Sequence, residues 1–156
     1  MNWIANWITP SDALALLAAG TAAAYAVELV RRRRVRRKVR GLATEWRMTY
    51  GRTDTLRLTP KVARAFPVPG AARVRVSHVI YGRDPADPGR YRYVFTAEYT
   101  AGVVQGKRRF VRVGTWSEPR DRDRGGPPGP VVLAPADLPL VEQYRRLAPD
   151  AVGGRQ

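Results

Sequence analysis

The chain has 156 residues, room for one modest domain besides terminal segments, and 44% hydrophobic residues exclude a wholly disordered protein. Its formal charge is +15, from 28 Lys and Arg against 13 Asp and Glu. The lack of cysteine excludes disulfides and thiolate metal sites, and the single histidine excludes a multi-histidine centre within one chain. Arginine comes with abundant alanine, glycine and proline, as GC-rich genomes favour, so arginine content alone is not read as a sign of function.

Residues 1–30 predict a membrane anchor. The run 13–27 carries no charge. As a helix rising about 1.5 Å per residue, residues 10–30 would span roughly 31 Å, which matches a bilayer core of about 30 Å. The preceding residues suit a helix start and a membrane interface, namely Trp3, Trp7, Thr9, Pro10 and Asp12. Glu28 falls at the edge of the span, where it can pair with Arg32.

Two other interpretations of this run remain open. Ala24-Tyr25-Ala26 has the form of a signal-peptide cleavage site, but signal peptides place their cations before the apolar run, not after it. A soluble subunit could instead bury the helix in a partner. The pair Gly20 and Ala24 has the small-xxx-small spacing that lets two membrane helices pack, so a homodimer is possible.

A basic run follows the apolar run directly. It has eight cations in ten residues: Arg31, Arg32, Arg33, Arg34, Arg36, Arg37, Lys38 and Arg40. Cations flanking one end of a span keep that end in the cytoplasm. We therefore expect the N-terminus outside the cell membrane and the rest of the chain in the cytoplasm. Contact with anionic lipid headgroups is the favoured role of the run, and nucleic-acid binding is the alternative.

Residues 31–51 predict a basic juxtamembrane helix that continues the anchor. Apolar residues recur at intervals of four, three and four positions, which places them in one stripe along a helix: Val35, Val39, Leu42 and Trp46. We expect this helix to reach about Tyr50 and to end at Gly51, with its apolar stripe on the following domain.

Residues 52–116 predict a small α+β domain. Thr59-Pro60 opens a short helix, and three strand-like runs cover 73–81, 90–100 and 107–116. The expected fold class is α+β: a transmembrane helix continuing into a basic amphipathic helix, then an antiparallel sheet of three to four strands with short flanking helices.

The last two runs predict a hairpin with a definite register. Pairing Phe95 with Val113, and likewise Ala97 with Val111 and Tyr99 with Arg109, gathers apolar side chains on one side. Glu98 would then pair with an arginine on the other face, and Arg92 could lie over Trp116. That outer face supplies a candidate partner-binding surface: Arg92, Arg108, Phe110, Arg112 and Trp116.

The C-terminal part predicts less structure. Residues 117–130 are rich in Pro, Gly and Arg and predict a loop or disordered linker. Residues 131–156 predict a short edge strand at 131–135, a helix with Leu140, Val141, Tyr144 and Leu147 on one side, and a frayed tail.

Catalytic and cofactor patterns are weak. His78 alternates with Val76 and Ile80 in a strand, which is typical of a core or half-buried histidine. Ser77 would point to the opposite face, and no glycine loop precedes a helix as phosphate sites require. We expect no enzymatic activity, no cofactor and no metal.

From Gly41 onward the chain resembles membrane-anchored, uncharacterised proteins of high-GC actinobacteria. The resemblance rests on Leu42-Ala43 followed by Trp46 and Tyr50, then on Tyr81-Gly82 and the run from Val94 to Thr100. It covers about half of the chain, which departs from the pattern in its Pro/Gly/Arg linker and extra C-terminal helix. The resemblance implies an anchored α+β domain and supplies no activity.

These patterns together favour a single-pass membrane protein whose cytoplasmic domain binds a protein partner, as an accessory subunit of a membrane assembly. One alternative is a membrane-tethered nucleic-acid-binding protein, for DNA transfer or chromosome attachment. A second is a soluble structural subunit with its N-terminal helix buried in a partner.

Overall fold

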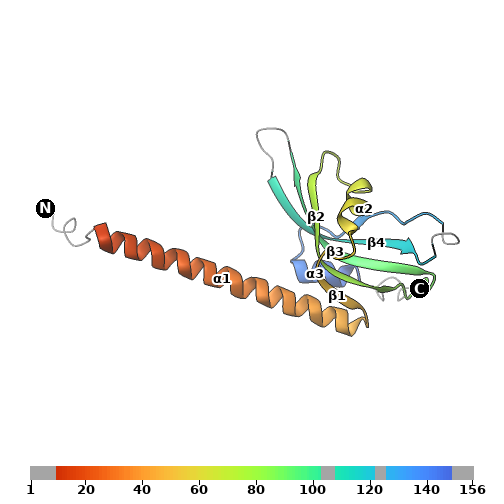
Figure 1. Cartoon of the computed structure of the whole chain (residues 1–156), viewed down its shortest axis with the longest axis horizontal. Coiled ribbons are helices and arrows are strands. Elements are labelled where there is room, and N and C mark those ends of the chain that lie inside the picture. The colour runs from red at the N-terminus through yellow and green to blue at the C-terminus, as the bar shows by residue number, and fades with distance from the viewer. Residues whose placement is uncertain (1–9, 103–107, 122–125, 149–156) are drawn as a thin grey trace. The chain divides into compact units, whose positions relative to one another are not determined.

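The computed structural model describes residues 10–102, 108–121 and 126–148, so Trp3, Trp7 and Thr9 lie outside it. Its elements in chain order are α1 (Pro10–Glu45), β1 (Thr49–Thr53), α2 (Leu58–Arg64), β2 (Ala72–Arg83), β3 (Arg90–Ala101), β4 (Arg108–Pro119), β5 (Val132–Leu133) and α3 (Leu140–Arg146) (Figure 1). The predicted α+β class is confirmed, with one long apolar helix before an antiparallel sheet. The chain divides into two compact units, residues 1–36 and 37–156.

Helix α1 ends five residues earlier than predicted. Arg47 adopts the left-handed conformation (φ 54°), and the amides of Arg47 and Met48 bond back to the carbonyls of Thr44 and Ala43. This pattern is a Schellman cap with arginine in the place that glycine usually takes. The prediction that the helix reaches Tyr50 is therefore wrong, and Gly51 lies inside strand β1.

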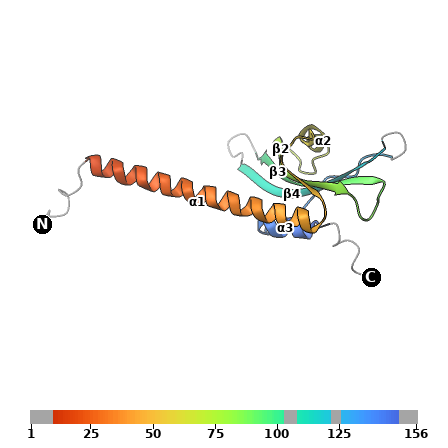
Figure 2. The same ribbon diagram turned by 60° about the horizontal axis from the view of Figure 1, so that its bottom comes forward.

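The five strands lie in chain order, β1-β2-β3-β4-β5, and each pairs antiparallel with the next. Helix α2 packs on one face of the sheet and α3 on the other (Figures 1 and 2). We call these the Tyr93 face and the Thr96 face. The core of the Tyr93 face is formed by α2 and the sheet together, by Leu58, Val62, Val76, Val79, Tyr93, Phe95, Ala97, Trp116 and Val131.

The predicted hairpin register of β3 and β4 is wrong by one residue. Phe95 lies opposite Gly114 instead of Val113, and Tyr99 lies opposite Phe110 instead of Arg109. The ring of Phe95 is fully buried and needs a partner without a side chain. A Cβ on Gly114 would meet that ring at 3.1 Å. Steric fit across the strands, rather than apolar count alone, selects the register.

A β-bulge in β2 breaks the alternation that predicts the orientation of His78. The register with β3 shifts between Ser77 and Ile80, and His78 has a positive φ of 49°. Val76 packs in the Tyr93-face core, whereas Ile80 pairs with Val94 on the Thr96 face. The prediction that Val76, His78 and Ile80 point the same way is therefore wrong, because the extra residue of a bulge reverses the alternation.

The C-terminal segment belongs to the sheet unit. Strand β4 runs to Pro119, three residues into the predicted linker, and the amide of Gly129 bonds to the carbonyl of Ser117. The predicted edge strand and final helix are confirmed as β5 and α3, with Tyr144 fully buried. Residues 122–125 and the predicted frayed tail, 149–156, lie outside the described residues.

Candidate functional site

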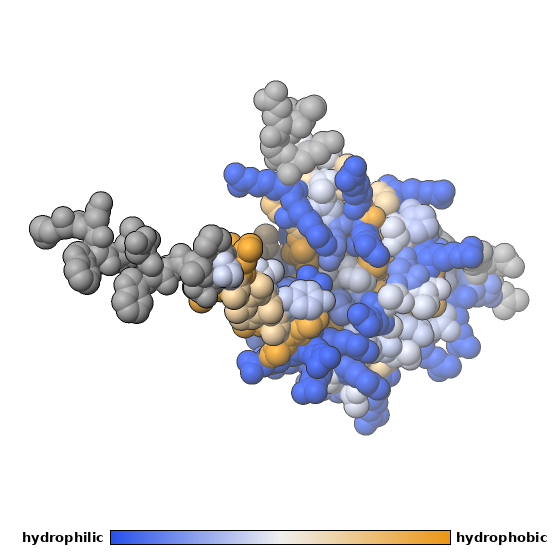
Figure 3. Space-filling view, turned by 60° about the vertical axis from the view of Figure 1, so that its left-hand side comes forward, coloured by the Kyte–Doolittle hydropathy of each residue, from blue (hydrophilic) through white to orange (hydrophobic). Residues whose placement is uncertain are grey.

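The apolar segment of α1 exposes large hydrophobic side chains around its whole circumference. Leu14, Leu16, Leu17, Tyr25 and Val27 are each 65–72% exposed. The helix from Ala13 to Glu45 is long and apolar enough to cross a membrane, and none of its most apolar window is buried. Hydrophobic side chains gather in orange on the surface of this segment (Figure 3). A helix that is hydrophobic all round requires an apolar surrounding, either lipid or a partner.

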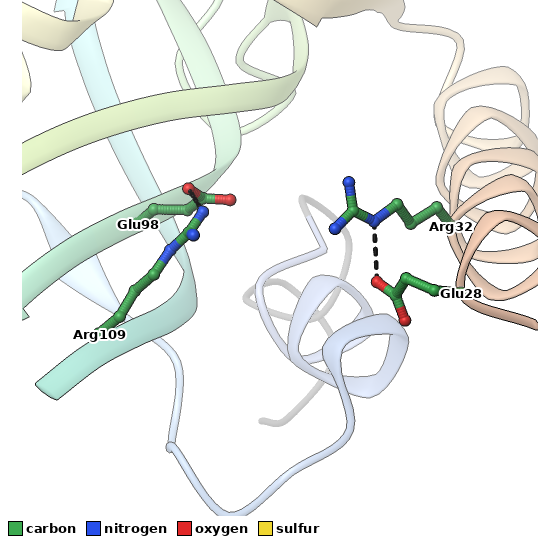
Figure 4. A network of polar contacts seen from close by, with 4 residues as sticks. All are labelled: Glu28, Arg32, Glu98 and Arg109. Carbon is green, nitrogen blue, oxygen red and sulfur yellow. Dashed lines mark hydrogen bonds and ion pairs between the residues drawn. The ribbon is translucent and has the colours of Figure 1, made fainter. Parts of the chain in front are cut away.

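The basic run continues the same helix without a break. All eight of its cations are exposed. Glu28, at the boundary between the apolar and the basic segment, forms the expected ion pair with Arg32, one helical turn on, at 2.8 Å (Figure 4). The pair neutralises the acidic side chain that directly follows the apolar run, so Glu28 is not an unpaired charge at this end of the span.

From the end of the basic run onward, the expected apolar stripe is buried within the sheet unit. Val39 is fully buried, Leu42 and Ala43 are nearly so, and Trp46 is half-buried. The final turns of α1 are thereby part of the sheet unit's packing. The sequence pattern for this stripe is confirmed from residue 39 onward.

The structure does not bring the predicted partner-binding residues together on one face. Arg92 lies on the Thr96 face with an 11% exposed side chain, 3.8 Å from the carboxylate of Asp84 and bonded to the carbonyl of Leu147 at 3.3 Å. Trp116 lies on the Tyr93 face and is only 4% exposed. The expected contact of Arg92 with Trp116 is wrong, because the one-residue change of register places the two side chains on opposite faces.

The cation over Trp116 is instead Lys61 of α2, 5.5 Å from the ring centroid. Lys61 also forms an ion pair with Glu118 at 2.7 Å, and the hydroxyl of Tyr93 donates to the other oxygen of Glu118 at 2.7 Å. Burial, followed by the Glu118 carboxylate, raises the pKa of Tyr93. The cluster fixes α2 to the sheet through satisfied groups, so its role is structural.

The remaining three candidates, Arg108, Phe110 and Arg112, lie together on the Tyr93 face near the start of β4. Phe110 is 39% exposed and stacks on Tyr99 with 5.4 Å between ring centroids. Arg108 is exposed, and the guanidinium of Arg112 donates to the carbonyl of Ala134. On the other side of the strand, Glu98 forms the predicted arginine pair, with Arg109 (Figure 4).

A polar network around His78 lies on the Thr96 face. Tyr50 hydroxyl and His78 Nδ1 lie 2.7 Å apart, and the hydroxyl of Tyr144 donates to the His78 carbonyl at 2.6 Å. The same hydroxyl lies 2.9 Å from Thr96 Oγ1, and burial raises the pKa of Tyr144. The half-buried histidine thus bonds inside the fold, as its sequence context favours. No local spacing in the sequence links Tyr50 or Tyr144 to His78, so sequence patterns do not identify either residue as its partner.

In residues 10–102, 108–121 and 126–148, no group of three or more His, Cys, Asp or Glu side chains could hold a metal ion. Comparisons with protein-family models, with curated proteins and with solved structures find no significant match.

Proposed function

We propose that the chain is a single-pass membrane protein with its N-terminus outside the cell membrane and its α+β domain in the cytoplasm. There the domain binds a protein partner, as an accessory subunit of a membrane assembly. The observation that carries the proposal is a helix with exposed large apolar side chains that passes directly into eight exposed cations. Lipid covers the first segment, and anionic headgroups attract the second by roughly 1 kcal/mol per cation near the surface.

The absence of cysteine makes orientation directly measurable. Asn2→Cys and Arg120→Cys would each introduce one thiol, to be labelled in intact cells with a maleimide that does not cross membranes. We expect Asn2→Cys to be labelled at once and Arg120→Cys only after the cells are opened. The reverse pattern would contradict the orientation, and intact mass would reveal removal of the helix as a signal peptide.

A charge in the apolar run tests the anchor itself. An arginine at mid-membrane costs roughly 2.5–3.5 kcal/mol on insertion scales, and this alanine-rich span has little surplus to offset it. Ala19→Arg should therefore move the protein from the carbonate-resistant membrane fraction to the soluble fraction, whereas the matched variant Ala19→Leu should remain in the membrane. Release of the unaltered protein by carbonate would favour a subunit whose helix is buried in a partner.

Nucleic-acid tethering stays the second candidate because the eight exposed cations would suit phosphates as well as headgroups. Salt distinguishes the two candidates. Binding of a DNA duplex by the full chain in neutral-lipid nanodiscs should fall by orders of magnitude between 50 and 200 mM salt if phosphate contacts carry it. We expect only weak, sequence-independent DNA binding at 50 mM salt. Tight binding at 50 mM salt that is lost at 200 mM would overturn the preferred function in favour of nucleic-acid tethering.

A further inference from the structure

The first half of β4 is an open sheet edge. Strand β5 pairs only with Gly114 and Thr115. The next outward-facing groups are occupied: Val113 accepts from the Ala134 amide at 2.8 Å and donates to Gln143 Oε1 at 2.8 Å. Because alternate residues of a strand direct their amide and carbonyl to the same side, those of Arg109 and Val111 also point outward. No hydrogen bond from the described residues reaches them.

Both sides of this edge carry exposed apolar surface. Phe110 is 39% exposed on the Tyr93 face, and Val111 is 45% exposed on the Thr96 face. An incoming strand would cover both side chains while pairing with the backbone groups of Arg109 and Val111. Exposed strand edges recruit extended segments in this way, with main-chain bonds supplying affinity and side-chain contacts supplying specificity.

The charge at this edge selects the occupant. Three arginines, Arg108, Arg109 and Arg112, lie within five residues. Glu98 forms an ion pair with Arg109. The Arg109 side chain remains 68% exposed despite this ion pair. Opposite charges across neighbouring strands stabilise pairing, and like charges oppose it. An acidic extended segment therefore fits, and a basic one does not.

A second copy of this chain fits poorly. In the antiparallel register in which Arg109 and Val111 of the two copies exchange bonds, Arg108 of each copy would face Arg112 of the other. Two like-charged pairs would then lie directly across the new strand pair, which is unfavourable. We propose that the open β4 edge at residues 108–112 binds an acidic, extended peptide segment of a partner protein by antiparallel strand addition.

Strand addition at this edge rests on the proposed function, because a cytoplasmic partner can reach it only if the domain lies in the cytoplasm. The probe is a fluorescent peptide with glutamate opposite Arg108, Arg109 and Arg112 and valine opposite Phe110 and Val111. The fluorescence anisotropy of this peptide would be measured as the full chain, in neutral-lipid nanodiscs, is added at 150 mM salt. We expect saturable binding, at least tenfold tighter than for the same peptide with lysine in place of glutamate.

Backbone bonding is tested separately from charge. Methylating the two peptide amides that face Arg109 and Val111 keeps the charge, removes the donors and should weaken binding at least tenfold. In the protein, Val111→Pro removes an outward donor that the β3–β4 ladder does not use, and proline is tolerated at such edge positions. Val111→Pro should lose at least tenfold in affinity, whereas Val111→Ala, which keeps the donor, should lose less.

The role of charge at the edge is tested by two variants with the same change in net charge. Arg108→Glu should weaken binding, whereas Arg120→Glu, with the same change in net charge outside this edge, should leave it unchanged. Circular dichroism would confirm that each variant keeps its sheet. Equal binding of the methylated peptide, of the lysine peptide or by Val111→Pro would overturn strand addition of an acidic segment, as would no binding at all.

Self-association that disappears in Val111→Pro would overturn the proposal in favour of a second copy as the occupant. The thiol-labelling result distinguishes failure of the edge site from failure of the proposed membrane orientation. If the labelling places the domain inside the cell and the peptide does not bind, only the edge site is refuted. Labelling that places the domain outside refutes the proposed function, whatever the peptide does.

Discussion

At the scale of single residues, fit between opposed side chains decides how the sheet is assembled. Gly114 leaves room for the buried ring of Phe95 from the neighbouring strand, and Leu133 closes the same space from β5. A Cβ on Gly114 would lie 3.0 Å from Leu133 and 3.1 Å from Phe95. Gly114 is thus required for packing, although a search of the sequence for apolar residues does not identify it.

We predict that Gly114→Ala destabilises the domain by about 1–3 kcal/mol, because neither neighbour can move without disturbing a close-packed core. The matched control is Gly51→Ala in β1, where a new Cβ would make only an ordinary contact at 3.5 Å. Chemical unfolding in detergent micelles, followed by tryptophan fluorescence, measures both. Equal stability of the two variants would show that the Phe95–Gly114 packing does not matter.

At the scale of elements, α3 completes a sheet edge that β5 is too short to cover. Gln143 is 3% exposed; its Oε1 accepts the Val113 amide and its Nε2 donates to the Leu138 carbonyl at 2.7 Å. One side chain thus supplies the acceptor for the Val113 amide that the backbone of a longer β5 would otherwise provide, and it also bonds the Leu138 carbonyl. Tyr144, the next residue of α3, is fully buried on the Thr96 face.

Gln143→Leu should cost about 1–3 kcal/mol of stability, since it leaves the buried Val113 amide without its acceptor. Its control is Glu142→Gln on the exposed side of α3, which loses only the exposed pair with Arg145 and should change stability by less than about 1 kcal/mol. Thermal unfolding by circular dichroism compares the two. A Gln143→Leu variant as stable as the control would rule out the bridging role.

At the scale of the whole molecule, the two units have different sources of order. Residues 37–156 contain the hydrophobic core, and every buried polar side-chain atom in the described residues has a hydrogen-bond partner. The apolar segment of α1 buries none of its most hydrophobic window. The sheet unit should therefore fold without residues 2–30.

We predict that a variant lacking residues 2–30 is soluble and unfolds within roughly 4 °C of the full chain, a difference of about 1 kcal/mol for a domain of this size. The measurement is thermal unfolding by circular dichroism, with sedimentation to check that the variant is monodisperse. An aggregated or unfolded product would mean that the apolar helix contributes to the core of the domain.

The sequence by itself determined the long apolar helix, the basic run, the α+β class and most strand positions. These depend on local composition and on periodicity along one segment, which a chain carries without its fold. The sequence pattern did not predict β1, because Tyr50 and Gly51 are typical of a helix end. Only the tertiary structure decided which residues meet: the Phe95–Gly114 register, the bulge at His78 and the split of Arg92 from Trp116. Those outcomes depend on steric fit between segments far apart in sequence, and that fit also leaves residues 108–112 as the open edge.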